Sequence, residues 1–321
     1  MELAGVGIDL GGTSVKMGVV TPEGEVLARK EGATPRGPAR PAVAELSRVV
    51  LQLIQASGLR PERIGSVGVG TPGILDSKKG LVRTASNLEG WVDVPLGDWL
   101  TNDLGRPVRV INDAHAAALG EIRFGTAKGI EDLVLLTLGT GVGGAVVVGG
   151  RVVEGSRGLA GELGHMRIEM SQPRPCGCGL FGCLEAYAGA KNILKRMHGA
   201  LADDIQEISL LKEKSKGGPL TVEDLFWAAA EGDGIMLRLV DETALALAAG
   251  IANLLHALNP KVVVLAGGLS RSALLVEKVQ EYLPDLVLNP AYLDDFCVTI
   301  SSLGSDAGLL GAAVAAMPFP S

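Results

Sequence analysis

The sequence has few aromatic residues, few cysteines and no excess of positive charge. Phe, Trp and Tyr make up 3% of its 321 residues, so the hydrophobic core must be aliphatic. Four cysteines are too few for a scaffold held by disulfides, and they suit a reducing compartment. The formal net charge of −7 argues against nucleic acid as a partner. A hydrophobic fraction of 47% beside a charged fraction of 20% instead predicts an ordered globular chain, long enough for two domains.

A targeting segment and a membrane-spanning helix are also not expected. No basic region precedes the first apolar run, and Asp9 interrupts that run. The uncharged stretch 133–150 is long enough to span a membrane, but it contains GTGVGG between two β-branched runs. We therefore expect a strand, a turn and a strand there, no membrane association and a cytoplasmic location.

Glycine, in contrast, is abundant, and three glycine-rich turns follow predicted buried strands. They are Gly11-Gly12-Thr13, the run from Gly139 through Thr140 and Gly141 to Gly144, and Gly267-Gly268. Backbone N–H groups in such turns can approach phosphate oxygens, and a Thr hydroxyl adds a donor. A plain hairpin explains any one turn equally well, but three at strand ends favour a nucleotide site. Asp9, at the end of the first strand, could hold Mg²⁺ through water.

Two common nucleotide motifs are missing. The sequence has no G-x-x-x-x-G-K-[ST], which excludes a P-loop. Its two G-x-G-x-x-G strings, at 68–73 and 139–144, lead into a loop and a strand and not into a helix, which argues against a Rossmann site.

The segment 161–185 has the composition of a zinc site. It contains one histidine and a C-x-C-x4-C cluster with glycines between the sulfurs, namely His165, Cys176, Cys178 and Cys183. Thiolates and imidazole are the ligands that structural zinc prefers. The alternative, buried free thiols, would scatter the cysteines as Cys297 is scattered. Glu162 and Glu185 flank the cluster without being needed for zinc, so the loop looks like a scaffold for a polar ligand.

The order of predicted elements indicates a duplicated α/β fold. Residues 5–30 and 133–154 both read as strand, glycine turn, strand, turn and strand, and such a repeat suggests two halves with a cleft between them. We expect helices over 41–58, before Leu100, from Asp113, over 241–260 and over 301–316, the last rich in small residues. Residues 74–91 read as a loop and 202–219 as an exposed connection.

One strand-to-helix junction carries candidate catalytic groups. Asn112 and Asp113 stand where α/β proteins often place reacting side chains, although Asp113 could equally serve only as a helix cap. His115, His198 and Cys297 are expected to be ordinary, with the thiol buried.

The motifs now in hand resemble a known family. In order along residues 8–270 they are IDLGGTSVKMGVV, VGTPGILD, ASNLEGW, VINDAHAAALGE, LTLGTGVGGAVVVGG, EGSRGLAGELGHM, CGCGLFGCLEAYAG and VVVLAGGLS. The chain resembles the sugar kinases of the ROK group (repressor, open reading frame, kinase), most of all its bacterial glucokinases. Repressors of the group carry a winged helix-turn-helix before the first glycine turn, and with seven residues before Ile8 a repressor is not expected here. Ser86 is a departure, because many of these glucokinases have Pro before the sugar-binding Asn.

The resemblance implies the actin/hexokinase-type fold, with two ribonuclease H-like domains around a cleft that holds ATP and sugar. The expected bounds are 1–116 plus 307–321 for the small domain and 117–306 for the large one, with the zinc loop at 161–185. Asp113 would be the catalytic base. The implied sugar-binding residues are Gly73, Asn87, Asn112, Glu162, His165 and Glu185. The implied ATP-binding residues are Asp9, Gly11, Gly12, Thr13, Thr140, Gly141, Gly267 and Gly268.

The implied activity is transfer of a phosphoryl group from MgATP to the 6-hydroxyl of a hexose, glucose first, with a structural Zn²⁺ and a homodimeric assembly. N-acetylmannosamine, N-acetylglucosamine, fructose and allose stay open as substrates, because kinases for these sugars share the same motifs. A sugar-sensing module without turnover is the alternative from another class.

Overall fold

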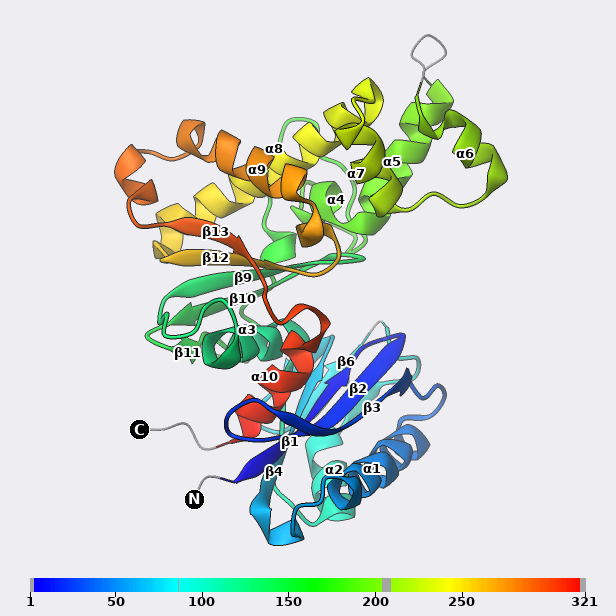
Figure 1. Cartoon of the computed structure of the whole chain (residues 1–321), viewed down its shortest axis with the longest axis vertical. Helices are drawn as coiled ribbons and strands as arrows, with labels where there is room; N and C mark the ends of the chain where they lie inside the picture. The colour runs from blue at the N-terminus through cyan, green and yellow to red at the C-terminus, as the bar shows by residue number, and fades with distance from the viewer. Residues whose placement is uncertain (1–2, 86, 204–208, 318–321) are drawn as a thin grey trace. The chain divides into compact units, whose positions relative to one another are not determined.

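The computed structural model describes residues 3–85, 87–203 and 209–317, and the chain divides into two compact units. Unit 1 comprises Met1–Glu131, Ala145–Gly161 and Ser301–Ser321, and unit 2 comprises Asp132–Gly144 and Glu162–Ile300 (Figure 1). This division is based on contacts within the chain, and the domain bounds expected from the sequence remain a prediction.

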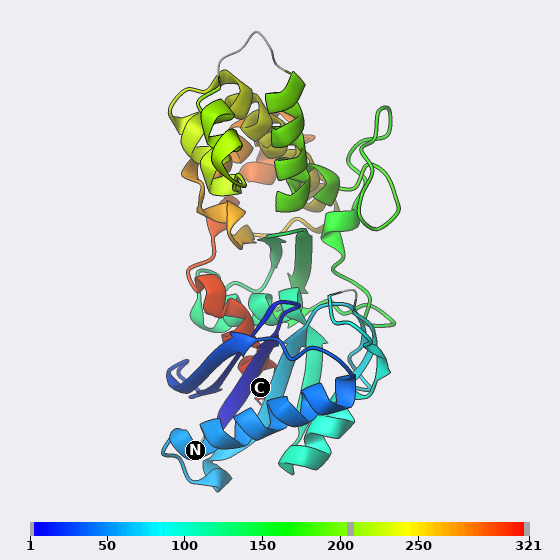
Figure 2. The same ribbon diagram turned by 90° about the vertical axis from the view of Figure 1, so that its right-hand side faces the viewer.

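Unit 1 is built on a five-stranded sheet of order β3-β2-β1-β4-β8. Its strands are β1 (Ala4–Leu10), β2 (Ser14–Val20), β3 (Val26–Ala33), β4 (Ile64–Thr71) and β8 (Val108–Asn112). Strand β1 is antiparallel to β2 and parallel to β4, as the two early hairpins and the later crossover require. Helices α1 (Ala39–Ala56) and α2 (Leu96–Leu104) cover one face, and α3 (Asp113–Phe124) and α10 (Ala307–Ala316) the other (Figure 2).

Helix α10 packs unusually close to its neighbours. A Cβ atom at Gly68 of β4 would lie 1.7 Å from the carbonyl oxygen of Ala312, and one at Gly311 would lie 1.6 Å from that of Ala116 in α3. Only glycine permits these approaches, because no other residue lacks the Cβ. The close packing expected of a small-residue helix near the C-terminus is confirmed.

Residues 74–91 differ from the loop expected there. They contain β5 (Ile74–Asp76) and β6 (Leu81–Thr84), which form a three-stranded antiparallel sheet with β7 (Val92–Val94). Strands of three or four residues are too short to display a clear period-2 pattern, so the sequence did not reveal them. The helix expected before Leu100 begins only at Leu96, after β7.

The second five-stranded sheet has the order β11-β10-β9-β12-β13, which repeats the connectivity of the first sheet. Its strands are β9 (Leu133–Leu138), β10 (Val142–Val148), β11 (Arg151–Val152), β12 (Val262–Ala266) and β13 (Cys297–Ile300). The duplication expected from the sequence is therefore confirmed, as is the strand–turn–strand reading of 133–150. Within residues 3–85, 87–203 and 209–317, no helix is both long and apolar enough to span a bilayer.

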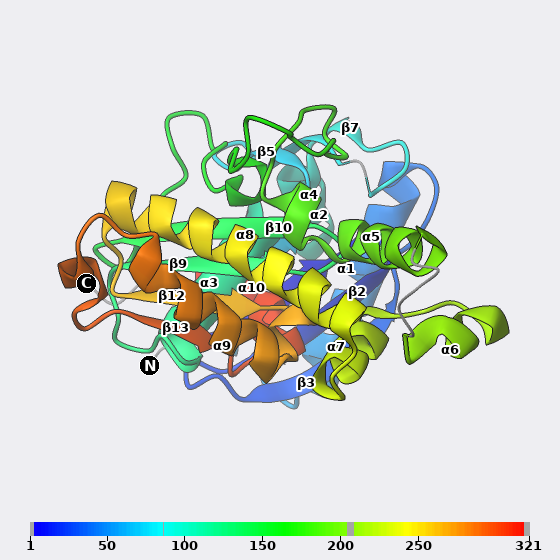
Figure 3. The same ribbon diagram turned by 90° about the horizontal axis from the view of Figure 1, so that it is seen from above.

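Unit 2 adds a layer of helices. They are α4 (Glu185–Ala188), α5 (Ala190–Asp203), α6 (Leu211–Gly217), α7 (Val222–Ala230), α8 (Gly234–Leu258) and α9 (Ala273–Tyr282). Figure 3 shows α8 and α9 side by side, in agreement with their contacts. Helix α8 begins seven residues before the expected start because the Asp233 carboxylate caps it, accepting from the N–H groups of Ile235 and Met236.

Two further expectations need correction. Part of the connection expected over 202–219 is helix α6, while residues 204–208 lie outside the described residues. Cys297 is exposed and not buried, and it lies on the edge strand β13. His115 is a buried core histidine and His198 is exposed, as expected of ordinary histidines.

Short 3₁₀ helices complete the fold. They cover Pro61–Arg63, Leu163–His165, Leu269–Arg271, Leu283–Asp285, Pro290–Leu293 and Gly304–Asp306.

Candidate functional site

In unit 1, the junction of β8 and α3 places Asn112 and Asp113 at the carboxyl edge of the sheet. Asn112 is the N-cap of α3, and its Oδ1 accepts from the N–H groups of Ala114 at 2.9 Å and His115 at 3.3 Å. Asp113 Oδ1 also accepts from Ala114 N–H, at 2.9 Å. The capping role weighed for Asp113 therefore falls mainly to Asn112. This leaves the amide Nδ2 of Asn112 and the second oxygen of Asp113 to meet a ligand.

Two carboxylates of unit 1 have perturbed acidity. Burial raises the pKa of Asp113, and the hydrogen bond from Ala114 only partly opposes this. Burial likewise raises the pKa of Asp9 to about 6, with Lys16 lowering it and the charge of Asp113 raising it further. The charge of Asp113 therefore contributes to the raised pKa of Asp9. A buried carboxylate with a raised pKa is better matched to proton transfer near neutral pH than an exposed one.

Lys16 is a candidate that the sequence analysis missed. It lies opposite Asp9 in the β1–β2 register, and its Nζ donates to the carbonyl of Ser305 at 2.7 Å. The sequence does contain a signal for Lys16. The hydrogen bond from Gly11 to Ser14 closes the hairpin, and counting back along the two strands from this turn places residue 16 opposite Asp9. The positive charge of Lys16 would offset the negative charges of Asp9 and of a phosphate bound near it.

Other predicted residues of unit 1 meet at the first glycine turn. A Cβ atom at Gly12 would lie 2.5 Å from Cβ of Asn87, so glycine is required for Asn87 to approach. Both line a cavity of about 210 Å³ that Trp91 also lines. Gly11 donates to the carbonyl of Ser14 and Thr13 is exposed beside it. Ser86, the departure noted in the sequence, lies outside the described residues.

Gly73 follows β4 in a conformation that suits only glycine. Its φ is +108°, and a Cβ atom there would lie 2.3 Å from the carbonyl oxygen of Thr84. The backbone at this position therefore lies close against β6.

In unit 2, the four predicted zinc ligands converge. The ligand atoms of His165, Cys176, Cys178 and Cys183 all lie within 4.8 Å of one another. Sγ of Cys178 is 3.8 Å from Sγ of Cys183, far longer than a disulfide, and Sγ of Cys176 is 3.8 Å from Nδ1 of His165. A tetrahedral site with Zn–S bonds of about 2.3 Å separates its sulfurs by about 3.8 Å. The donor set and its spacing fit Zn²⁺.

The thiols of the cluster differ in acidity. Burial raises the pKa of Cys176 to about 12, so this thiol alone would keep its proton at neutral pH. Binding of a divalent cation displaces the proton and stabilises the thiolate. Cys178 differs, because it is exposed and the backbone N–H of Leu180 lowers its pKa.

Glu185 lies at the first position of α4 and connects the zinc loop with the second glycine turn. Its Oε2 accepts from the N–H of Val142 at 3.0 Å, and its Oε1 is 3.4 Å from Sγ of Cys176. Glu162 precedes the 3₁₀ turn of His165, and its carbonyl accepts from His165 N–H at 3.0 Å while its side chain is exposed. Glu162, His165 and Glu185 thus come from one segment.

The second and third glycine turns meet in unit 2. Gly267 has a φ of +93°, and a Cβ atom there would lie 2.4 Å from the carbonyl of Leu138, next to Gly139. Thr140 is exposed, and a Cβ atom at Gly268 would meet nothing within 4 Å. The carboxyl ends of parallel β9 and β12 therefore present open backbone side by side, as a phosphate site requires.

Comparisons with known proteins agree with this geometry. The profile of the ROK family matches residues 5–317. A glucokinase from Halalkalibacterium halodurans is 37% identical over 309 residues, covering 95% of this chain and 92% of the relative. An N-acetyl-D-glucosamine kinase from Pectobacterium atrosepticum is 32% identical, covering 96% of this chain and 97% of the relative.

A solved structure is similar over the same extent. It is a ROK family glucokinase from Streptomyces griseus in complex with glucose and AMPPNP, with a TM-score of 0.81, 31% identity, and coverage of 98% of this chain and 99% of that one. The family profile, the full-length identity and the repeated sheet order agree on one assignment. The chain belongs to the ROK family.

Proposed function

We propose that this chain is an ATP-dependent hexokinase that phosphorylates the 6-hydroxyl of a hexose, with glucose as its best substrate. The observation that carries the proposal is the placement of Asp113, a partly buried carboxylate with a raised pKa at the first turn of α3, whose charge acts on Asp9. The glucose and AMPPNP bound by the Streptomyces griseus relative support the same pair of ligands here.

In this proposal, each unit contributes its own residues. Unit 1 supplies the base Asp113, the sugar-binding groups of Asn87, Asn112 and Gly73, and the phosphate-binding turn 11–13. Unit 2 supplies Glu162, His165 and Glu185 for ring hydroxyls, and the turns at Thr140-Gly141 and Gly267-Gly268 for ATP. Carboxylates accept several hydrogen bonds, as recognition of a polyol requires.

The reaction is an in-line displacement. The Asp113 carboxylate accepts the proton of the 6-hydroxyl as that oxygen bonds to the γ-phosphorus, and the bond from the γ-phosphorus to the β–γ bridging oxygen breaks to release ADP. Backbone N–H groups of the glycine turns hold the phosphate oxygens while charge moves onto the leaving group. Asp113 afterwards returns its proton to solvent.

Mg²⁺ and Zn²⁺ would support the reaction, the first by charge neutralisation and the second by holding a loop in place. Asp9 is the residue that would hold the water shell of Mg²⁺, which neutralises phosphate charge when bound. Zn²⁺ held by His165 and the three cysteines would fix the segment that carries Glu162 and Glu185, which is a structural role.

A different hexose is the nearest alternative. The N-acetyl-D-glucosamine kinase relative makes an N-acetylated sugar a specific rival, and N-acetylmannosamine and fructose stay open as well. From another class, a sugar sensor would bind hexose without releasing ADP.

ADP release measured with MgATP across a panel of hexoses tests the proposal. We expect ADP release that depends on added hexose and is highest in kcat/KM with glucose. Release no faster than the sugar-free background with every hexose would exclude the kinase, and a glucose-induced rise in Tm would then favour the sensor. Cytoplasmic location and a homodimer belong to the same proposal.

A further inference from the structure

Helix α4 carries Glu185 but is too short to hold its own position. It spans only Glu185–Ala188 and begins two residues after the zinc ligand Cys183. A single helical turn is not stable by itself in water, because nucleation is unfavourable. Contacts from outside α4 must therefore fix its place.

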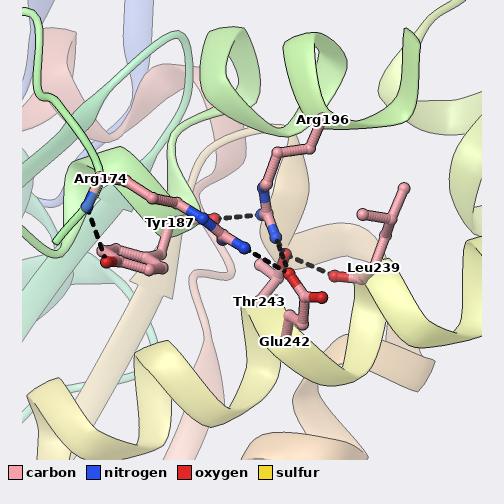
Figure 4. A network of polar contacts seen from close by, with 6 residues as sticks. All are labelled: Arg174, Tyr187, Arg196, Leu239, Glu242 and Thr243. Carbon is pink, nitrogen blue, oxygen red and sulfur yellow. Dashed lines mark hydrogen bonds and ion pairs between the residues drawn. The ribbon is translucent and has the colours of Figure 1, made fainter. Parts of the chain in front are cut away.

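Arg196 of α5 provides such contacts through one guanidinium group. Its Nη2 donates to the carbonyl of Tyr187 in α4 and to Oγ1 of Thr243 in α8 at 2.9 Å. Its Nη1 donates to Oε2 of Glu242 in α8, also at 2.9 Å (Figure 4). The side chain of Arg196 is only 13% exposed, whereas that of Glu242 is 48% exposed, so the bonds to Tyr187 and Thr243 are better shielded from water than the ion pair. A single side chain thus ties α4 to α8.

Arg174, two residues before Cys176, holds the other end of Tyr187. Its backbone N–H donates to the Tyr187 hydroxyl at 3.1 Å, and its guanidinium lies over the Tyr187 ring at 4.8 Å. Its Nη2 donates to the same Oε2 of Glu242 at 2.9 Å, as Figure 4 shows. Glu242 is therefore shared by an arginine of the zinc loop and an arginine of α5.

Glu242 is the central residue of a charged cluster that also contains Arg174 and Arg196. Two guanidinium groups converge on one carboxylate, and without it they would only repel each other. Burial raises the pKa of Glu242, but the two arginines more than offset this and hold it below its usual value. Burial, followed by the charge of Arg174, lowers the pKa of Arg196. Neutralising Glu242 would leave the largely buried guanidinium of Arg196 without its carboxylate partner.

We propose that Glu242 and Arg196 are positioning residues that hold α4 and the adjoining zinc-ligand segment on α8, and thereby set the place of the Glu185 carboxylate. The inference rests on the proposed function, in which Glu185 binds the sugar. It adds that the sugar-binding carboxylate is held from two sides, by the metal ligands on one and by the arginine–glutamate cluster on the other.

The test substitutes Glu242→Gln, which removes the charge and keeps the shape. The matched control is Asp241→Asn, the neighbouring residue on α8, which loses the same charge from an ion pair with Lys278 that does not involve the zinc loop. The measurements are KM and kcat for glucose, the amide hydrogen exchange rate over 161–188, and the rate of metal loss to a chelator after loading with one equivalent of Zn²⁺.

We expect Glu242→Gln to raise KM about tenfold with kcat changed less than about threefold, because a charge-assisted hydrogen bond pair is lost away from the reacting atoms. Exchange over 161–188 and metal loss should each be about tenfold faster, and Asp241→Asn should leave all of them unchanged. Wild-type KM, exchange and metal loss in Glu242→Gln would overturn the inference, as would equal effects in both variants.

The design separates the two proposals. If the wild-type chain releases no ADP with any hexose, the kinase proposal fails while exchange and metal loss still test the cluster. If Glu242→Gln does not fold, Arg196→Lys replaces it, because this variant keeps the positive charge but loses the planar group that joins Tyr187 to α8. We expect about threefold faster exchange over 161–188 in Arg196→Lys, and an unchanged rate would also overturn the inference.

Discussion

The carboxylate of Glu185 occupies the space that a side chain at position 141 would need. A Cβ atom at Gly141 would lie 2.2 Å from Oε2 of Glu185, the oxygen that accepts from Val142 N–H. The carboxylate can approach the backbone this closely because residue 141 has no Cβ. A glycine proposed for the ATP site thus leaves room for a carboxylate proposed for the sugar site.

Gly141→Ala should therefore displace Glu185. Overpacking of this kind destabilises by about 1–3 kcal/mol, and we expect the glucose KM to rise about tenfold with a smaller change in kcat. The control is Gly139→Ala in the same turn, where an added Cβ would meet nothing within 4 Å. Equal KM values for the two variants would remove the steric link between Gly141 and Glu185.

Asp113→Asn should abolish most turnover without unfolding the chain. Loss of a general base lowers kcat by about 10²–10⁴. Because burial raises the Asp113 pKa, the ionised side chain destabilises the native state at neutral pH, and the amide should match or exceed wild-type Tm. Glucose binding should persist, since the amide still hydrogen-bonds a hydroxyl. A variant with near-wild-type kcat would remove Asp113 from the mechanism.

The raised pKa of Asp9 predicts a pH-dependent effect of Asp9→Asn. The folded chain binds the extra proton between the unfolded pKa of 3.8 and the folded pKa of about 6, so this group's contribution to stability is full below pH 4 and is lost as the pH rises to 6. In metal-free buffer at pH 7, Asp9→Asn should be more stable than wild type by about 3 kcal/mol. Denaturant unfolding of both proteins at pH 4.5 and pH 7 measures the difference. A difference that is the same at both pH values would mean that Asp9 titrates normally.

Freshly purified protein should contain one zinc per chain, and Cys178→Ser should lose it. Metal binding is coupled to local folding, so Tm should fall and the sugar KM should rise together as the segment 161–185 loosens. Elemental analysis and kinetics on the same preparation give both quantities. Cys297→Ser is the matched control, because that thiol is exposed and lies outside the cluster. Full activity in zinc-free protein would contradict the prediction.

The sequence predicts what depends on local patterns. The zinc cluster follows from the spacing of three cysteines, and the duplicated sheets follow from two stretches in which apolar strands alternate with glycine turns. The start of α3 follows from Asn112 and Asp113 beside a β-branched strand. Each of these patterns lies within a short continuous stretch of the chain.

Features that depend on tertiary packing are not visible in that way. Arg174 and Glu242 are 68 residues apart, so nothing in the sequence relates them. Lys16 becomes a candidate site residue only when the strand pairing shows that it lies opposite Asp9. The strands β5–β7 have three or four residues each and become strands because they pair, while Cys297 is exposed because β13 forms the sheet edge. Propensity alone cannot decide such cases.

Sugar choice is the prediction that most directly divides the proposed glucokinase from its relatives. Glu162, His165 and Glu185 come from one segment of unit 2, so we expect them to meet neighbouring hydroxyls on one side of the ring. Loss of one hydroxyl leaves a carboxylate or imidazole unpaired, at about 1–3 kcal/mol, while an N-acetyl group at carbon 2 needs additional room. We therefore expect kcat/KM to be highest for glucose, lower by about tenfold or more for 2-deoxyglucose, and lower for N-acetylglucosamine and N-acetylmannosamine. The four sugars are compared at fixed MgATP. A higher kcat/KM for either N-acetyl sugar would refute the preference for glucose and leave the kinase activity standing.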